Sequence, residues 1–299
     1  MGNVSNLKLD EAIELLAALF HFGYGSKEIF EEIEKHLGKN IESLSADKIF
    51  LVLSTFVQSG KMRPKFLLLI QKRVVEIKEK FAVKDLTKIL RIYTSVETQY
   101  EYIYEKLEKY LLTLKDYLGS EELANLVFSY SNPNIKSKYF ILNDLEDIII
   151  NKLDTMATER AFEPIVDILY SYLFCKKGEK RLIDKLFHVL TNAKEELGLS
   201  ANGHFKLYFC FVELKTPLAI TTKFDSSLLQ KSVSLSKNDL ISINTFLRQL
   251  NYSNIDTLTI LDNLMKIEMS HLNDDEKFEK KCSTLSDYGI KPIFDLFKF

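Results

Sequence analysis

Ten basic side chains are concentrated in residues 61–91, where only three acidic side chains accompany them and the net charge is +7. Residues 1–47 instead hold four basic and nine acidic side chains, a net charge of −5. Lysine and arginine bind phosphate groups through charge and donated hydrogen bonds, so the basic segment is the natural place for contact with a polyanion. We select seven candidate nucleic-acid-binding residues: Arg63, Lys65, Lys72, Arg73, Lys84, Lys88 and Arg91.

Aromatic side chains follow the basic segment and could stack on unpaired bases, namely Tyr100, Tyr102, Tyr104 and Tyr110. Alternate residues cannot share one face of a helix, and lysine-rich helix surfaces are commonly only solvated, so ordinary surface is the competing interpretation. A smaller basic group carries the same two interpretations: Lys176, Lys177, Lys180, Arg181 and Lys185.

Other residue types give little sign of chemistry. The five histidines are scattered, and the three cysteines (Cys175, Cys210 and Cys282) are far apart, without the spacing of metal ligands. No phosphate-binding glycine loop, nucleophile motif or calcium loop is present. His204 is the most interesting of the histidines because it occupies an apolar position, where a partly buried packing role is the favoured interpretation. The sequence therefore predicts no enzyme, no bound metal, no cofactor and no small-molecule substrate.

Composition narrows the fold class. Of 299 residues, 46% are hydrophobic, which is enough for a sizeable core, while only 10 glycines and 5 prolines occur, which disfavours a turn-rich all-β fold. The formal net charge of −2 argues mildly against a dedicated nucleic-acid binder. The apolar runs are too short to cross a bilayer, so no membrane insertion is expected.

A repeat accounts for the positions of the apolar residues. Seven anchors lie 37, 37, 37, 42, 39 and 39 residues apart: Leu19, Phe56, Tyr93, Tyr130, Tyr172, Phe211 and Leu250. The anchors and the residues three, four and seven before them make 28 positions, of which 27 are apolar, against about 13 expected from composition. This spacing is one face of an α-helix, which we call helix A of each repeat.

A second helix, B, is predicted in most repeats from apolar residues ten and fourteen positions after the anchor, such as Phe66 and Ile70. One hairpin has too little core to fold alone, so neighbouring hairpins must stack. The sequence predicts an all-α, right-handed α-solenoid of about seven helix-hairpin repeats of 37–42 residues. We expect one domain over residues 1–270, with a possible bend near 131–137, and a capping helix and tail over 271–299.

The period and the apolar pattern of helix A, seen best in residues 48–56 and 85–93, resemble the heptatricopeptide and octotricopeptide repeats. These repeats occur in organellar RNA-associated proteins of the RAP and FASTK type, although no RAP domain is recognisable here. The resemblance implies a non-catalytic helical-repeat protein of a mitochondrial or other organellar matrix, in particular a mitochondrial ribosomal or ribosome-assembly component. Its partners would be RNA, above all ribosomal RNA, and neighbouring proteins of a large assembly.

A second function stays open beside this one. The nearly balanced charge favours a protein–protein scaffold, or an accessory subunit of a mitochondrial respiratory or ATP synthase assembly, that makes no RNA contact. A cytoplasmic location is also compatible with the sequence.

Overall fold

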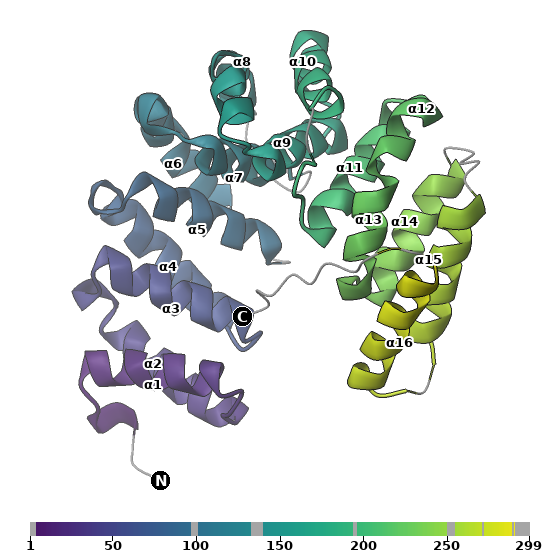
Figure 1. Cartoon of the computed structure of the whole chain (residues 1–299). Coiled ribbons are helices and arrows are strands. Elements are labelled where there is room, and N and C mark those ends of the chain that lie inside the picture. The colour runs from purple at the N-terminus through teal and green to yellow at the C-terminus, as the bar shows by residue number, and fades with distance from the viewer. Residues whose placement is uncertain are drawn as a thin grey trace. The chain divides into compact units, whose positions relative to one another are not determined.

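The computed structural model of the protein describes residues 4–96, 101–132, 140–193, 196–249, 255–270, 272–288 and 290. Within these ranges every regular element is helical and no strand occurs, which confirms the predicted all-α class (Figure 1). The chain divides into two compact units, residues 1–148 (unit 1) and 149–299 (unit 2). The boundary lies inside α8 (Phe140–Thr158), whereas the predicted bend near 131–137 falls mostly outside the described residues.

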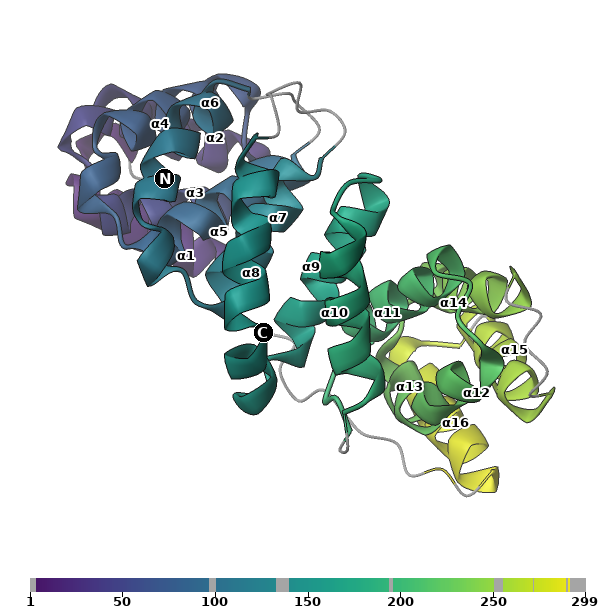
Figure 2. The ribbon, with the colours of Figure 1, turned by 90° about the horizontal axis from the view of Figure 1, so that it is seen from above.

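Unit 1 contains two rows of helices (Figure 2). Its A row consists of α1 (Leu9–His21), α3 (Ala46–Gln58), α5 (Val83–Ser95) and α7 (Ser120–Tyr130). Its B row consists of α2 (Lys27–Lys39), α4 (Pro64–Glu76) and α6 (Glu101–Thr113). Each A helix packs on the next A helix along the chain, and each B helix on the next B helix. This is the packing expected of stacked hairpins.

Short 3₁₀ helices join each B helix of unit 1 to the following A helix. They are η2 (Ile41–Ser43), η3 (Lys78–Lys80) and η4 (Lys115–Tyr117), and η1 (Val4–Asn6) precedes the first hairpin. The starts of η2, η3 and η4 lie 37 residues apart, which is the period found in the sequence. The connections therefore repeat as regularly as the helices do.

Unit 2 is built from α9 (Phe162–Phe174), α11 (Ala201–Glu213) and α14 (Lys237–Gln249), which pack in chain order and form its A row. The other elements that begin in unit 2 are α10 (Lys180–Thr191), α12 (Leu218–Thr221), η5 (Thr222–Phe224), α13 (Asp225–Lys231), η6 (Ser232–Ser234), α15 (Ile255–Glu268) and α16 (Asp274–Asp287). The second helix of the sixth hairpin, whose apolar pattern is degenerate in sequence, is broken into the short elements α12, η5 and α13.

The predicted core positions are buried. The residues three before the seven predicted anchors are all 0% exposed: Leu16, Leu53, Leu90, Val127, Leu169, Tyr208 and Leu247. Among the other predicted positions that the structure describes, only Leu15, Leu19 and Phe246 are half-buried instead of buried. The apolar face of helix A therefore supplies the core of both units.

Side chains one repeat apart meet directly, which confirms the register of the repeat within each unit. In unit 1 the guanidinium of Arg91 lies over the ring of Phe128, 4.7 Å from its centroid. In unit 2 the rings of Tyr170 and Phe209 lie 5.0 Å apart, and Lys206 pairs with Asp167, 39 residues away. Since equivalent positions face one another, neighbouring A helices run parallel.

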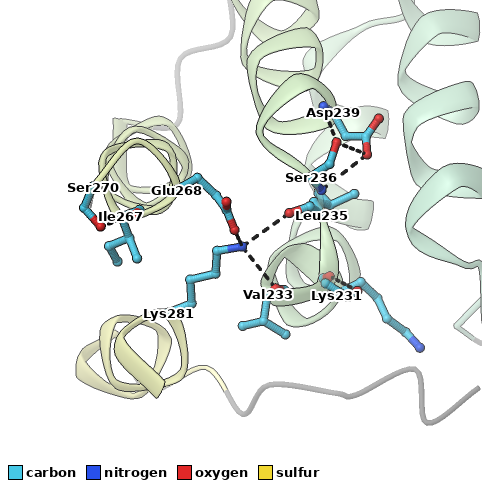
Figure 3. Close-up of polar contacts among 10 residues, drawn as sticks. Lys231, Val233, Leu235, Ser236, Asp239, Ile267, Glu268, Ser270 and Lys281 are labelled. Atoms are coloured by element: carbon cyan, nitrogen blue, oxygen red, sulfur yellow. Dashed lines mark hydrogen bonds and ion pairs between the residues drawn. The ribbon is translucent and has the colours of Figure 1, made fainter. Parts of the chain in front are cut away.

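The last helix is fixed to unit 2 by a buried lysine. Lys281 of α16 is 3% exposed, and its ammonium group pairs with Glu268 of α15 (Figure 3). The same group donates to the carbonyl oxygens of Val233 and Leu235, at 3.2 and 3.3 Å. Because a buried cation is costly unless it is paired and hydrogen-bonded, these three acceptors define where α16 packs. None of the described helices is long and apolar enough to cross a membrane.

Candidate functional site

Arg63, a predicted nucleic-acid-binding residue, instead binds the buried carboxylate of Glu34. Its Nε donates to Glu34 Oε1 at 2.7 Å, and its backbone N–H donates to Oε2 at 3.2 Å. Glu34 is only 4% exposed, so its charge requires a partner. Arg63 thus joins α2 to the start of α4, a structural role that sequence reasoning did not foresee.

The other two predicted arginines are also engaged within the protein. Arg73 donates from Nη2 to the carbonyl oxygen of Glu42 at 2.6 Å, which ties α4 to η2. Arg91 donates from Nη1 to Asn125 Oδ1 at 2.9 Å, in addition to its contact with the Phe128 ring. All three arginines are therefore at least partly committed to the packing of unit 1.

The four predicted lysines are exposed: Lys65, Lys72, Lys84 and Lys88. None of them forms an ion pair with another residue that the structure describes. Lys65 and Lys72 lie on α4 of the B row, whereas Lys84 and Lys88 lie on α5 of the A row. The continuous basic surface expected from the sequence is thus divided between the two rows.

The tyrosines proposed as stacking partners have different environments. Tyr104 is buried, and its hydroxyl donates to the carbonyl oxygen of Leu90 at 3.1 Å. Tyr102 is 41% exposed, with Lys106 Nζ 5.7 Å from its ring centroid. Tyr110 is half-buried beneath Lys78, and Tyr100 lies outside the described residues. Of the three described, only Tyr102 offers substantial ring surface to solvent.

A polar cavity of about 380 Å³ lies in unit 2 beside His204. It is lined by Thr191, Ala193, Glu196, Leu197, His204, Lys223, Phe224, Ser226, Ser227 and Gln230. His204, 1% exposed, forms part of the wall from the core face of α11, as its apolar position in the repeat predicts. The cavity brings a buried imidazole next to hydroxyl, carboxylate and ammonium groups from α13, η5 and the segment before α11.

A chain of three hydrogen bonds passes through His204. Nδ1 is 2.9 Å from the carbonyl oxygen of Ser200, Nε2 is 2.9 Å from Ser227 Oγ, and that hydroxyl donates to Glu196 Oε1 at 2.9 Å. Three such contacts need three protons, while a neutral imidazole and one hydroxyl supply two. All three contacts are satisfied together only when one further proton is bound.

Burial lowers the pKa of His204, an effect opposed by its bond to Ser200 and by the nearby charges of Glu163 and Glu196, and reinforced by Lys231. The neutral form therefore prevails at neutral pH. A serine hydroxyl within reach of an imidazole is the first requirement for a nucleophile and its base. Here the Ser227 hydroxyl donates to Glu196 instead of to the imidazole, so the arrangement is not that of a nucleophile and its base.

Neither thiol chemistry nor metal binding has a prepared site in the part of the chain that the structure describes. Burial raises the pKa of the Cys210 thiol, and it also raises the pKa values of Cys175 and Cys282. A raised pKa disfavours the reactive thiolate. No group of three or more possible metal-ligating side chains occurs among the described residues.

An aromatic strip runs across the A row of unit 2, from outward-facing positions of α9 and α11 to a predicted core position of α14, and sequence reasoning missed it. It consists of Tyr170, Phe174, Phe205, Phe209 and Phe246. Its rings make an unbroken series of contacts from α9 across α11 to α14, with centroids 5.0–6.4 Å apart. The sequence does contain a signal: Tyr170/Phe174 and Phe205/Phe209 are spaced by four on the helix face opposite the core.

A buried ion pair lies beside the aromatic strip. Lys206 and Asp167 are 6% and 5% exposed, and Lys206 Nζ donates to Asp167 Oδ1 at 2.5 Å. The same ammonium group lies 5.9 Å from the centroid of the Tyr170 ring. The rings therefore shield from water two charges that occupy an otherwise outward-facing position of the repeat.

Lysines replace glycine at the ends of two A helices beside this strip. Four residues after the anchor the chain is left-handed, with Gly23 at φ 65° and Gly60 at φ 63° in unit 1, and Lys176 at 54° and Lys215 at 48° in unit 2. This conformation costs roughly 1–2 kcal/mol for a residue other than glycine. The helix dipole favours a cation here by about 0.3–1 kcal/mol, which offsets only part of that cost.

No protein-family model matches the chain, and no curated protein matches it.

Proposed function

We propose that this chain is a non-catalytic helical-repeat protein of an organellar ribonucleoprotein, such as a mitochondrial ribosomal or ribosome-assembly component. In this proposal the hairpins form a right-handed α-solenoid of about seven repeats of 37–42 residues. Unit 1 contacts RNA, and further surfaces contact neighbouring proteins of the assembly. The 37-residue period of the connections η2, η3 and η4 supports the repeat architecture.

The observation that carries the RNA contact is the exposure of Lys65, Lys72, Lys84 and Lys88 without ion-pair partners among the described residues. Lysines that are not neutralised within the protein retain their charge for phosphates and release counterions on binding. The pairs on the two rows of unit 1 offer two contact surfaces, of which the pair on α5 adjoins Arg91 and its Phe128 partner.

The test replaces all four lysines with glutamate and measures binding to total organellar RNA as a function of salt. Affinity should fall, and the log–log salt slope should flatten by about 0.7 for each phosphate of a single strand that the variant no longer binds. A matched variant reverses four exposed lysines outside both basic groups: Lys109, Lys115, Lys237 and Lys280. Arg63 is left intact because its removal would strand the buried charge of Glu34. Equal affinity for the two quadruple variants would refute the proposed RNA surface.

A second candidate is a protein scaffold without RNA contact, for instance an accessory subunit of a mitochondrial respiratory or ATP synthase assembly. The engagement of Arg63, Arg73 and Arg91 within unit 1 favours it, since arginine is the stronger phosphate ligand. Purification from the native source discriminates the two: nuclease treatment should release a ribonucleoprotein component and leave a scaffold bound to its protein partners.

A further inference from the structure

The aromatic strip presents an apolar surface that the fold of unit 2 leaves in contact with solvent. Phe174 is 47% exposed, and the other four rings are half-buried. Another exposed apolar side chain of the A row, Ile241 on α14, is 41% exposed. Contiguous apolar surface of this kind marks interaction sites more often than isolated exposed side chains do.

The inclination of the rings distinguishes two classes of partner. Only Tyr170 and Phe174 lie nearly parallel, at 17°. The remaining contacts are inclined by 64°, 55°, 42° and 67°, so successive rings present edges as well as faces. Unpaired bases require open ring faces, whereas the side chains of a helix fit the ridges and hollows of a corrugated surface. The geometry favours a helix.

Two lysines at one end of the aromatic strip indicate that the partner helix is acidic. Lys176 follows Phe174 at the end of α9, and Lys215 occupies the equivalent place after α11. Because α9 and α11 run parallel and in register, the two lysines border the same end of the strip. Both are exposed, and neither forms an ion pair among the described residues. We call Lys176 and Lys215 the lysine edge.

The backbone of the lysine edge is an independent observation. Both lysines adopt the left-handed conformation that glycine occupies at the same repeat position in unit 1. The anchor carbonyls accept the same closing hydrogen bonds in both units: Tyr24 N–H donates to Leu19, Lys177 N–H to Tyr172 and Thr216 N–H to Phe211. Glycine would thus form the same left-handed helix end with less backbone strain. A strained residue at two equivalent positions points to a role outside folding.

We propose that the aromatic strip and the lysine edge together form a docking site for an acidic amphipathic helix of a partner protein. The apolar stripe of that helix packs across α9, α11 and α14, and its carboxylates meet Lys176 and Lys215. The proposal supplies a partner class for the protein contacts of the proposed function. It is independent of the RNA contact assigned to unit 1, so either can fail without the other.

The experiment displays a library of helical peptides of about 18 residues, roughly five turns, with varied apolar residues on one face and both acidic and basic residues on the other. Binders are selected on the full-length protein and counter-selected on its Phe174→Ala variant. Selected peptides should be rich in Asp and Glu. Their dissociation constants should rise at least about fivefold with Phe174→Ala and stay unchanged with Phe22→Ala, an exposed aromatic of unit 1.

Lys176→Gly and Lys215→Gly provide the decisive variants. Each should weaken binding of the selected peptides about twofold to fivefold while the thermal midpoint holds or rises, because glycine relaxes the backbone. Lys180→Ala, on α10, is the matched control and should leave binding unchanged.

Any of four outcomes overturns the proposal. The first two are a selection that yields no peptide dependent on Phe174, and a selection whose peptides lack an acidic bias. The third is binding of a labelled oligouridylate that depends on Phe174 and Lys215, which would assign the surface to single-stranded RNA. The fourth is a loss of stability without a loss of affinity in the glycine variants, which would mean that the lysines serve the helix ends alone.

Discussion

The outward faces of the two A rows place the same residue type at the same repeat position in opposite environments. Lys88 in unit 1 and Lys206 in unit 2 both lie five residues before their anchors. Lys88 is exposed, whereas Lys206 is 6% exposed and paired with Asp167. Neighbouring rings make the difference, since Tyr170 and Phe209 flank Lys206, whereas Ser54 and Arg91 occupy the equivalent positions around Lys88.

This comparison shows that a repeat fixes where a side chain lies but not what it does. The core positions of helix A, which are the anchor and the residues three, four and seven before it, are alike in the two units because every hairpin must bury the same face. The outward columns are under no such constraint. In unit 1 Lys88 is exposed to solvent, whereas in unit 2 Lys206 is covered by aromatic rings. The outward-facing positions of helix A can therefore differ between the units and bind different partners.

The largest difference between the units is expected from the two equivalent lysines. Lys206→Met should lower the free energy of unfolding by about 3–5 kcal/mol, because it leaves the buried charge of Asp167 without this partner. Lys88→Met should change it by less than about 0.5 kcal/mol. Chemical denaturation of both variants measures the contrast. Equal effects would mean that the rings of unit 2 do not shield the ion pair as described.

The core columns should respond alike in both units. Leu90→Ala and Leu169→Ala each remove a fully buried side chain and should each cost about 2–5 kcal/mol. Hydrogen exchange read residue by residue should show the loss of protection concentrated in the unit that carries the substitution. A small effect at either leucine would contradict the assignment of both to equivalent core positions.

The helix ends should respond in opposite directions. Gly60→Lys places a side chain in the left-handed conformation and should cost about 1–2 kcal/mol through the backbone alone, because no atom lies within 4 Å of the added carbon. Lys215→Gly should leave stability unchanged or raise it. Thermal unfolding of the two single variants checks the signs, and destabilisation by both would show that Lys215 supports the fold of unit 2.

The smallest effect is a pH dependence that belongs to unit 2. Burial lowers the pKa of His204 in the folded protein, so the unfolded chain binds this proton more tightly. Neutral His204 therefore makes its full contribution to the free energy of unfolding above the ordinary histidine pKa of about 6.5. That contribution is lost as pH falls through the lower pKa of the folded protein. The stability difference between wild type and His204→Gln, measured from neutral to mildly acidic pH, should shift in favour of the variant on acidification.

His21→Gln, which alters an exposed histidine of unit 1, is the matched control for this titration. A difference between wild type and His204→Gln that is independent of pH would show that folding does not shift the pKa of His204. A shift in favour of wild type on acidification would show that the hydrogen-bond chain through Ser227 and Glu196 raises that pKa.

The apolar pattern of helix A by itself determined the class of the fold, the register of the hairpins and the burial of Leu53, Leu90, Val127 and Leu169. Such a pattern is readable because burial of one helix face is a local requirement that recurs in every repeat. The division of the chain within α8 was not readable, since the helix and its apolar residues continue through the boundary without a change of composition.

Only the tertiary structure decided which charged residues remain available for a partner. Charge counts placed Arg63, Lys65 and Lys72 in one basic segment, but the fold pairs Arg63 with Glu34 across two helices and leaves the lysines exposed. It also assembled the aromatic strip and the hydrogen-bond chain through His204 from residues of separate elements. Ion pairs, ring contacts and proton sharing depend on the distance between side chains far apart in sequence, and that distance is set by packing.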